Sequence, residues 1–280
     1  MKIRVLFAFL LTMSCFAYAQ NDKLIILHTN DMHSQVEPIS EKIGGFKSGK
    51  GGMVRLYSYI HYIKSTNPNV LLLDAGDFSQ GSSYYNLFKG NTEIDMMNLV
   101  HYDAGTMGNH EFDLGMDNLA KLFEKANFPI INCNYDLSNT PLKNLVKDYV
   151  IVYKAGLKIG VFGLGTPDLY GLTFKKNIKN LVIKDTYNSA NGIADKLKNE
   201  EKCDLVICLS HLGWNDTPVC DSLLATKSKY IDVIVGGHSH TYMKTAKHVK
   251  NVVGNDVIVN QTSGNTASVG RIEIDLKKKE

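Results

Sequence analysis

Histidine and carboxylate side chains of this 280-residue chain gather at a few points, and each group follows a short apolar run. The run DVIVGG ends in two glycines and leads into His238 and His240. Asp31 and His33 follow the run KLIILHT in the same way, and Asp77 follows VLLLDAG. Imidazole nitrogens combined with carboxylate oxygens are ligands that zinc, manganese and iron accept. The pattern therefore indicates metal chemistry.

Two further segments contribute residues of the same kind. TMGNHEFD contains Asn109, His110 and Asp113, and VICLSHLG contains His211. No motif is specific by itself, because H-x-H also occurs in exposed turns and a lone histidine is usually a hydrogen-bonded core residue. Their joint occurrence, each at the end of a strand-like run, favours one shared site. In α/β sheets, ligands bind where the carboxyl ends of the strands converge.

The spacing within two of these groups predicts how their side chains are aimed. In extended backbone, side chains at positions i and i+2 share a side, so Asp31 and His33 are expected to face one point. The same holds for His238 and His240. The glycines that precede them allow close approach of the backbone, because no side chain stands in the way.

The number of candidate ligands exceeds what one tetrahedral ion needs. Two ions about 3.5–4 Å apart, with one shared carboxylate, would use them all, and Asp77 is the predicted bridge. The predicted ligands are Asp31, His33, Asp77, Asn109, His211, His238 and His240. The remaining histidines have no comparable setting and are expected to be structural: His28, His61, His101 and His248.

The elements that must position these residues alternate along the chain. Continuous apolar runs at 23–29, 69–77, 128–134, 158–165, 204–211 and 231–240 predict strands that are covered on both faces. Helix-period segments at 51–66, 92–100, 116–127 and 186–200 lie between several of them, which predicts an α/β domain with helices outside the sheet. The successive runs 257–264 and 268–276 predict a more antiparallel closing segment. We expect residues 20–280 to form one domain, since no repeat or low-complexity linker interrupts them.

Residues 1–19 have the pattern of a secretory signal peptide. Lys2 and Arg4 precede an apolar core and an A-x-A site, which predicts cleavage between Ala19 and Gln20. Lipidation through Cys15 is the second choice, because Thr12 stands where an aliphatic residue is usual. The apolar core is shorter than the roughly 20 residues of a membrane span. No other segment is a candidate span, so a periplasmic or secreted protein is predicted.

Charge and cysteine content argue against other classes of function. Without Lys2 and Arg4, 29 of the 31 basic residues remain against 28 acidic ones, and no basic patch predicts a nucleic-acid partner. The cysteines that follow the leader show no C-x-x-C spacing, and no disulfide is predicted among them: Cys133, Cys203, Cys208 and Cys220. Cys208 lies in an apolar run and is expected to be a buried free thiol.

The motifs TNDMHS, GDFSQGS, GNHEFD, LSHLG and GGHSHT, in this order, resemble those of the calcineurin-like metallophosphoesterases. More narrowly, they are similar to the catalytic, N-terminal domain of the secreted 5′-nucleotidase and 2′,3′-cyclic-nucleotide phosphodiesterase branch. The resemblance extends from about Lys23 to Leu276. It implies a four-layer α-β-β-α sandwich and two divalent metal ions, either Zn, Mn or Fe.

The resemblance also assigns roles by position. One ion would take Asp31, His33, Asp77 and His240, and the other would take Asp77, Asn109, His211 and His238. His110 would be the catalytic histidine, oriented by Asp113, and Asn109 and His110 would contact the substrate. Ser34 replaces a glycine that is common in the family, and this change affects no ligand.

The implied reaction is hydrolysis of phosphate esters of nucleotides. Metal binding lowers the pKa of water to about 7, so hydroxide held between two ions would attack phosphorus in line with the leaving oxygen. Protonated His110 would stabilise the phosphoryl charge or protonate the leaving alkoxide. One alternative is another substrate: a different phosphate ester, a cyclic diester or a sulfur oxyanion. The other is a non-catalytic metal-binding subunit of a nucleotide-binding complex, against which the intact residue set argues.

Relatives in this branch usually continue into a second domain that stacks the nucleoside on aromatic rings and holds the phosphate with arginine. The sequence ends at Glu280, where that domain would begin. Base recognition is therefore expected from a separate exported chain, from loops of this chain, or not at all. Trp214, just after HLG, is either a residue of the site mouth or a packed aromatic.

Overall fold

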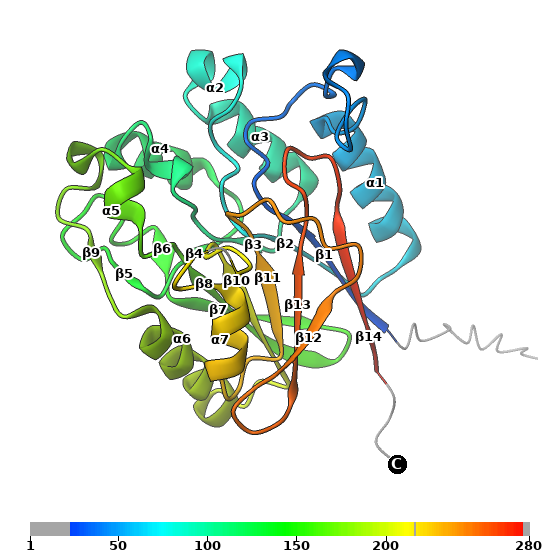
Figure 1. Cartoon of the computed structure of the whole chain (residues 1–280), viewed down its shortest axis with the longest axis vertical. Helices are drawn as coiled ribbons and strands as arrows, with labels where there is room; N and C mark the ends of the chain where they lie inside the picture. Colours follow the sequence, from blue (N-terminus) through cyan, green and yellow to red (C-terminus); the bar gives the residue numbers. More distant parts are fainter. Residues whose placement is uncertain (1–22, 216, 277–280) are drawn as a thin grey trace, which may run out of the picture.

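The structure is a computed structural model that describes residues 23–215 and 217–276 (Figure 1). The predicted signal peptide and its cleavage site lie outside these residues. The strands are β1 Lys23–Thr29, β2 Val70–Asp74, β3 Ala104–Gly105, β4 Ile130–Ile131, β5 Tyr135–Asp136, β6 Val146–Lys147, β7 Tyr149–Lys154, β8 Leu157–Leu164, β9 Val182–Ile183, β10 Leu205–Ser210, β11 Val233–Gly236, β12 Lys247–Lys250, β13 Asp256–Gln261 and β14 Gly270–Asp275. The α-helices are α1 Met53–Thr66, α2 Ser83–Phe88, α3 Asn91–Val100, α4 Met116–Lys125, α5 Leu169–Leu172, α6 Thr186–Asp195 and α7 Asp221–Lys227. Short 3₁₀ turns cover Glu41–Ile43, His110–Phe112 and Lys175–Ile178, and a π-helical turn, Lys196–Glu200, extends α6.

Two six-stranded sheets form the centre of the molecule. The first has the strand order β14-β1-β2-β3-β4-β6 and the second has the order β12-β13-β11-β10-β8-β7. Parallel pairing dominates both sheets, while β14, β12 and β7 are antiparallel edge strands. A separate two-stranded sheet pairs β5 with β9.

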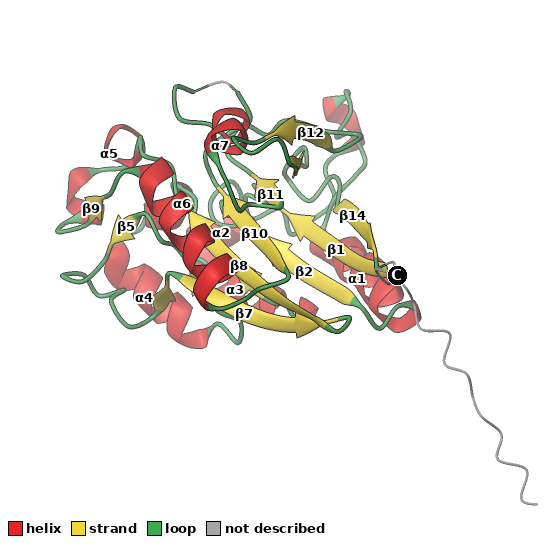
Figure 2. Cartoon of the chain, turned by 90° about the horizontal axis from the view of Figure 1, so that it is seen from below, coloured by secondary structure: helices red, strands yellow, loops and turns green. Residues whose placement is uncertain are grey.

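The continuous apolar runs are explained by the position of the sheets between helices. Along β1, Leu24 and Ile26 face the core between the two sheets, where they meet residues such as Val161 of β8. Ile25 and Leu27 face the opposite core, shared with α1, α3 and α4. A third core lies between the second sheet and helices α6 and α7. The predicted four-layer α-β-β-α sandwich is thus confirmed, and Figure 2 shows α6 on the near side of the strands and α1 on the far side.

The outer helices show the expected amphipathic spacing. In α4, the buried residues Met116, Leu119, Leu122 and Phe123 recur at three- and four-residue intervals on one face. Helix α6 begins at Asp185, whose side chain accepts a hydrogen bond from Asn188 N at 2.8 Å and so caps one free backbone donor. The helices predicted at 51–66, 92–100, 116–127 and 186–200 are all present.

Three details depart from the sequence predictions. The run 128–134 forms only the two-residue strand β4, because the chain then crosses between sheets: Asn132 N bonds to Lys147 O and Cys133 N bonds to Gly163 O. The closing segment is antiparallel only in part, since β14 is antiparallel to β1, whereas β13 is parallel to β11 and lies in the other sheet. The elements that were not predicted are helices α2, α5 and α7 and strands β3, β5, β6, β7, β9 and β12.

The register of the parallel strands aligns their carboxyl ends. Thr29 at the end of β1 lies opposite Asp74 at the end of β2, and Ser210 of β10 lies opposite Gly236 of β11. The loops that follow these four strands therefore leave the two sheets at a common edge. These loops carry most of the predicted ligands.

The described cysteines are buried free thiols, as predicted for Cys208. Among the residues that the structure describes, no helix combines the length and the apolarity that crossing a membrane requires.

His28 is a histidine packed between the two sheets, and its titration can test this packing. This residue of β1 is fully buried, and neither ring nitrogen forms a hydrogen bond. A Cβ atom at Gly270 would lie 1.9 Å from His28 Nε2, so the glycine on β14 makes room for the ring. Burial lowers the pKa of His28 from 6.5 to about 4.

We expect His28 to make the protein less stable at acid pH. Below pH 6.5 His28 binds a proton in the unfolded chain, whereas in the folded chain it is not protonated until about pH 4. The free energy of unfolding therefore falls between these two pH values. The loss approaches about 3 kcal/mol, at 1.36 kcal/mol per pKa unit. Urea unfolding of wild type and His28→Leu at pH 7.5, 6 and 4.5, with chelator present, measures the effect. The variant should lose less stability on acidification, and equal losses would contradict the assignment.

Candidate metal centre

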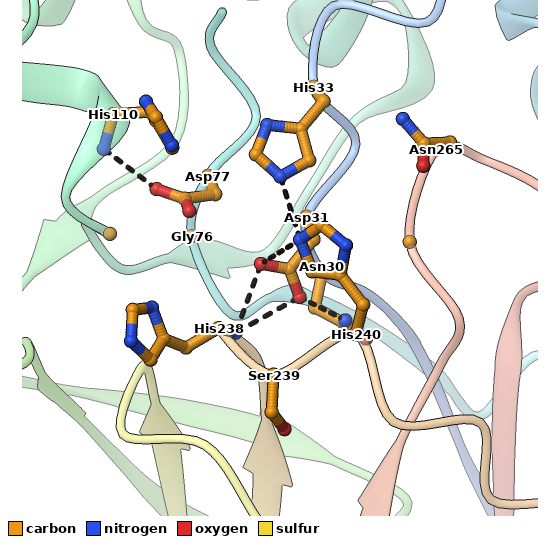
Figure 3. Close-up of polar contacts among 12 residues, drawn as sticks. Asn30, Asp31, His33, Gly76, Asp77, His110, His238, Ser239, His240 and Asn265 are labelled. Atoms are coloured by element: carbon orange, nitrogen blue, oxygen red, sulfur yellow. Dashed lines mark hydrogen bonds and ion pairs between the residues drawn. The ribbon is translucent and has the colours of Figure 1, made fainter. Parts of the chain in front are cut away.

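The predicted site residues converge at the common edge of the two sheets (Figure 3). Three groups of metal-ligating side chains each have all their ligand atoms within 4.8 Å of one another. These groups are Asp31 with His33 and His240, Asp77 with His211 and His238, and His33 with Asp77 and His110. Asn109 lies in the same loop as His110, directly after β3. The structure thus brings together six of the seven predicted ligands and His110, and Asn109 is the residue before His110 in the chain.

The backbone that aims these side chains is not the predicted extended one. Asp31 and His33 have φ values of 49° and 47°, and His238 and His240 have values of 76° and 51°. Asp77 has a φ of 54°. The expectation that i and i+2 side chains of extended backbone share a side is therefore wrong. The side chains of these five residues converge because the backbone of each residue is in the left-handed conformation. This conformation costs about 1–3 kcal/mol in a non-glycine residue.

Glycines make room for the crowded ligands, as predicted. A Cβ atom at Gly108 would lie 2.1 Å from Asp77 Oδ1 and 2.6 Å from His211 Nε2. A Cβ atom at Gly237 would lie 2.8 Å from Ala75 O. The glycines in TMGNHE and VGGHSH are therefore required by close contacts in the site itself.

The donor group around Asp31 faces the more open side of the site. His33 Nε2 and His240 Nε2 lie only 2.9 Å apart, and Asp31 Oδ1 lies 3.5 Å from His240 Nε2. Asp31 is fully buried, and its carboxylate accepts two hydrogen bonds of 3.0 Å from His238 N. Burial opposes its ionisation, but hydrogen bonding to His240 and the charge of His211 keep the pKa of Asp31 below its usual value.

The donor group around Asp77 contains ligand atoms that have no other partner. His211 Nδ1 lies 2.7 Å from Ala75 O and donates to it, which leaves Nε2 to face Asp77. Burial opposes the charged ring, but the carboxylates of Asp77 and Asp31 raise the pKa of His211 to about 10, so a metal ion at Nε2 would displace a proton. That Nε2 is buried without a hydrogen bond and lies 3.0 Å from Asp77 Oδ2. Asn109 Oδ1 is likewise buried and unpartnered. A ring nitrogen and a carboxylate oxygen 3.0 Å apart need a proton or a cation between them, so the donor set fits a metal ion.

His110, which belongs to the third group, forms a hydrogen-bonded pair with Asp113. His110 Nδ1 lies 2.8 Å from Asp113 Oδ2, and His110 N donates to Asp77 Oδ1 at 2.9 Å. The hydrogen bond to Asp113 outweighs burial and raises the pKa of His110 from 6.5 to about 9. A histidine held in its charged form is a proton donor rather than a metal ligand. In this form His110 can donate a proton, and its catalytic role stays a prediction.

Glu111 is a supporting residue that the sequence analysis missed. Its buried carboxylate accepts hydrogen bonds from Asp77 N at 2.9 Å, Ser79 N at 3.0 Å and Gly108 N at 2.6 Å. It thereby joins the loop after β2 to the loop after β3. Burial, reinforced by the charge of Asp77, raises the pKa of Glu111 to about 7. The feature of the sequence that could have revealed Glu111 is an acidic residue in the GNHEF turn, next to the apolar residue Phe112.

Two side chains far along the sequence also support the ligands. Asn30 Nδ2 donates to Asp31 Oδ2 at 2.5 Å, and Asn30 Oδ1 accepts from Thr262 N at 2.8 Å. Gln261 Oε1 accepts from Ser239 Oγ and Thr241 N, on either side of His240. No local pattern could have revealed these links, because Asn30 and Thr262 are 232 residues apart and Gln261 lies 22 residues after Ser239, at the end of β13.

The other candidate residues take structural positions. Trp214 is partly buried and packs against the core beneath α6 and α7, which favours the packed-aromatic alternative. His28 lies between the sheets, and His61 stacks on Tyr57 of α1. Within the described residues, none of the four histidines assigned to structural roles belongs to a metal-ligating group.

Taken with the fold, this site places the chain among the metal-dependent hydrolases of phosphate esters. Residues 24–242 match the family model described as calcineurin-like phosphoesterase, and the chain belongs to that family. The human 5′-nucleotidase is 37% identical over 233 residues, which cover 80% of this chain and 39% of that protein. "Protein 5NUC" of Lutzomyia longipalpis is 33% identical over 270 residues, covering 91% and 46%.

The family membership is supported by a solved structure. The 5′-nucleotidase precursor from Thermus thermophilus superposes with a TM-score of 0.83 and 32% identity, covering 90% of this chain and 51% of that one. The chain thus spans less than half the length of the two curated relatives named above.

Gly108→Ala should destroy metal binding while the fold persists. The added Cβ would meet Asp77 Oδ1 at 2.1 Å, so the carboxylate must move away from His211. We expect Mn²⁺ affinity, measured by calorimetry, to fall at least about tenfold, since displaced ligands lose optimal coordination geometry. Gly192→Ala is the matched control, because its Cβ meets nothing within 4 Å and alanine favours the helix. Wild-type affinity in the Gly108 variant would show that the ligands do not bind where the structure predicts.

Proposed function

We propose that this chain is an exported, dinuclear metal-dependent hydrolase of nucleotide phosphate esters, of the 5′-nucleotidase type. The proposal rests on one observation above all: unpartnered buried ligand atoms surround Asp77, beside a histidine whose pKa is raised to about 9. Both features occur where three groups of metal-ligating side chains meet, and a bound cation would offset the cost of the unpaired buried acceptors. The 5′-nucleotidases among its relatives support the choice of nucleotide substrates.

We assign the ligands to two ions with Asp77 between them. The first ion would be held by Asp31, His33, Asp77 and His240, and the second by Asp77, Asn109, His211 and His238. Nitrogen and oxygen donors of this kind suit Zn, Mn or Fe. When bound, such ions lower the pKa of water and neutralise charge on phosphoryl oxygens.

The side chains of the chain itself would bind the ester and move the proton. The Asn109 side-chain amide supplies an N–H donor for a phosphoryl oxygen, while its Oδ1 faces the proposed ion. His110 uses Nδ1 to bond Asp113, which leaves the protonated Nε2 to donate to the leaving alkoxide. Asp113 fixes the ring orientation and favours the charged form. Glu111 holds the two loops that carry Asp77 and Asn109 in register.

Export and a partner chain are proposed on sequence grounds. The leader pattern supports a periplasmic or secreted location, which recovery of a chain beginning at Gln20 outside the cytoplasm would check. A separately encoded exported chain that adds a nucleoside-binding surface should co-purify with it. A lone monomer with full nucleotide selectivity would contradict that partner.

Hydrolysis by the purified chain, from Gln20 to Glu280, tests the proposed function. The panel contains AMP, UDP-glucose, 2′,3′-cyclic AMP and p-nitrophenyl phosphate, each with added Mn²⁺ or Zn²⁺. We expect metal-dependent phosphate release from AMP, and its loss in Asp77→Asn, which weakens the shared ligand. Turnover of the cyclic diester alone would reassign the substrate class. An absence of turnover with both metals demonstrably bound would favour a non-catalytic subunit.

His110→Ala should separate catalysis from metal binding. The imidazole lies beside the ligand groups and, in the proposed assignment, holds no ion, so the variant should bind Mn²⁺ as wild type does. Loss of the general acid should reduce kcat by about 10²–10⁴-fold. Asp113→Asn should reduce kcat less, because the histidine remains but loses the partner that raises its pKa. Wild-type kcat in His110→Ala would remove this residue from the mechanism.

A further inference from the structure

A second cavity lies beside the His110–Asp113 pair and outside the proposed metal ligands. Its volume is about 450 Å³. The residues that line it come from the loop before α2, from α2, from the turn after His110–Phe112, and from the end of α5 and the segment after it: Gln80, Tyr85, Asn86, Asp113, Gly171, Leu172, Thr173 and Phe174. In Figure 1, α2 and α5 lie on the side of the molecule toward which β1 and β2 run.

The cavity is tied to the turn that carries the proposed acid catalyst. Asp113, which accepts the hydrogen bond from His110 Nδ1, forms part of the wall. Thr173 Oγ1 donates to Asn109 O at 3.4 Å, and Asn177 Nδ2 donates to Asp113 O at 2.8 Å. These bonds hold segment 171–177 against the turn. The far end of a substrate whose ester oxygen lies at His110 would therefore reach this cavity.

Three polar side chains in the wall have no partner within the described chain. Neither the amides of Gln80 and Asn86 nor the hydroxyl of Tyr85 forms a hydrogen bond there, although only 4% of Tyr85 is exposed. Asn86 is exposed and Gln80 is half-buried, so both amides are accessible to a ligand, and Tyr85 adds a hydroxyl at a buried position. Together these groups offer donors and acceptors that match a ligand with several polar atoms.

The remaining walls are largely apolar, and the Lys176 ammonium lies 5.8 Å from the centroid of the Phe174 ring. Phe174 is 75% exposed and Leu172 is 48% exposed, so both present apolar surface to an incoming ligand. Among the described lining residues there is no lysine or arginine, and Asp113 is the one ionisable carboxyl. A flat heterocycle can stack on the exposed Phe174 ring.

We propose that this cavity binds the nucleoside of a nucleoside monophosphate whose phosphate lies at the metal centre. This assignment rests on the proposed function. The base stacks on Phe174, and the amides of Gln80 and Asn86 bond to its polar edge, as such side chains do with adenine elsewhere. The chain then carries part of its own base recognition.

The test compares two phosphate esters that differ only in the leaving group. Values of kcat/KM are measured with Mn²⁺ for AMP and for glycerol 2-phosphate, in wild type, Phe174→Ala and Tyr153→Ala. Tyr153, on β7, is 73% exposed and serves as the matched control for loss of a surface aromatic ring. In Phe174→Ala the ratio of AMP to glycerol 2-phosphate should fall about tenfold, because one stacked ring is lost. In Tyr153→Ala the ratio should stay at the wild-type value.

An unchanged ratio in Phe174→Ala, or an equal loss with both esters, would overturn the proposal. If wild type hydrolyses neither ester, the proposed function fails, and adenosine binding then decides the cavity separately. Saturation-transfer NMR with adenosine should give a signal for wild type and Tyr153→Ala that is weakened in Phe174→Ala. Equal signals in the three proteins, or none in wild type, would refute a nucleoside site.

Discussion

The structure depends on holding buried carboxylates close together without water around them. Asp31, Asp74, Asp77 and Glu111 are each at most 2% exposed. Burial favours the neutral form of every one, yet their surroundings divide them into two pairs. Nearby histidines keep the pKa values of Asp31 and Asp77 below the usual range, whereas those of Asp74 and Glu111 are raised. The first pair can therefore bind cations, and the second pair supports the backbone.

Asp74 and Glu111 form hydrogen bonds that hold the strained loops of the site in place. Asp74 accepts hydrogen bonds from Thr29 Oγ1 and Gly76 N, and thereby joins the ends of β1 and β2. Glu111 joins the loops after β2 and β3. The left-handed residues that aim the proposed ligands would relax without such links, because each is unfavourable by itself. The two sheets provide the anchors from which these loops emerge at one edge.

The residues of the site could be predicted from their types and from their positions at strand ends. The local backbone geometry of the site could not be predicted from the sequence. His238 and His240 could be assigned from their position after an apolar run, but nothing local indicates a φ of 76° or 51°. That conformation depends on contacts such as Gln261 with Ser239, which join distant segments. Contacts between distant segments also explain why the run 128–134 was predicted as one long strand, although its backbone crosses from one sheet to the other. The fold class was predictable because continuous apolarity follows directly from burial on both faces.

Specificity can be separated from chemistry in this architecture, because the two use different parts of the fold. The proposed ligands follow strands β1, β2, β3, β10 and β11, whose ends are fixed by sheet pairing. The cavity beside Asp113 is instead built from α2 and the segment after α5, which belong to connections outside the sheets. Such connections tolerate substitution more readily than paired strands do. A change at Phe174 would therefore alter the leaving group that is accepted, while the buried carboxylates and their hydrogen bonds stay in place.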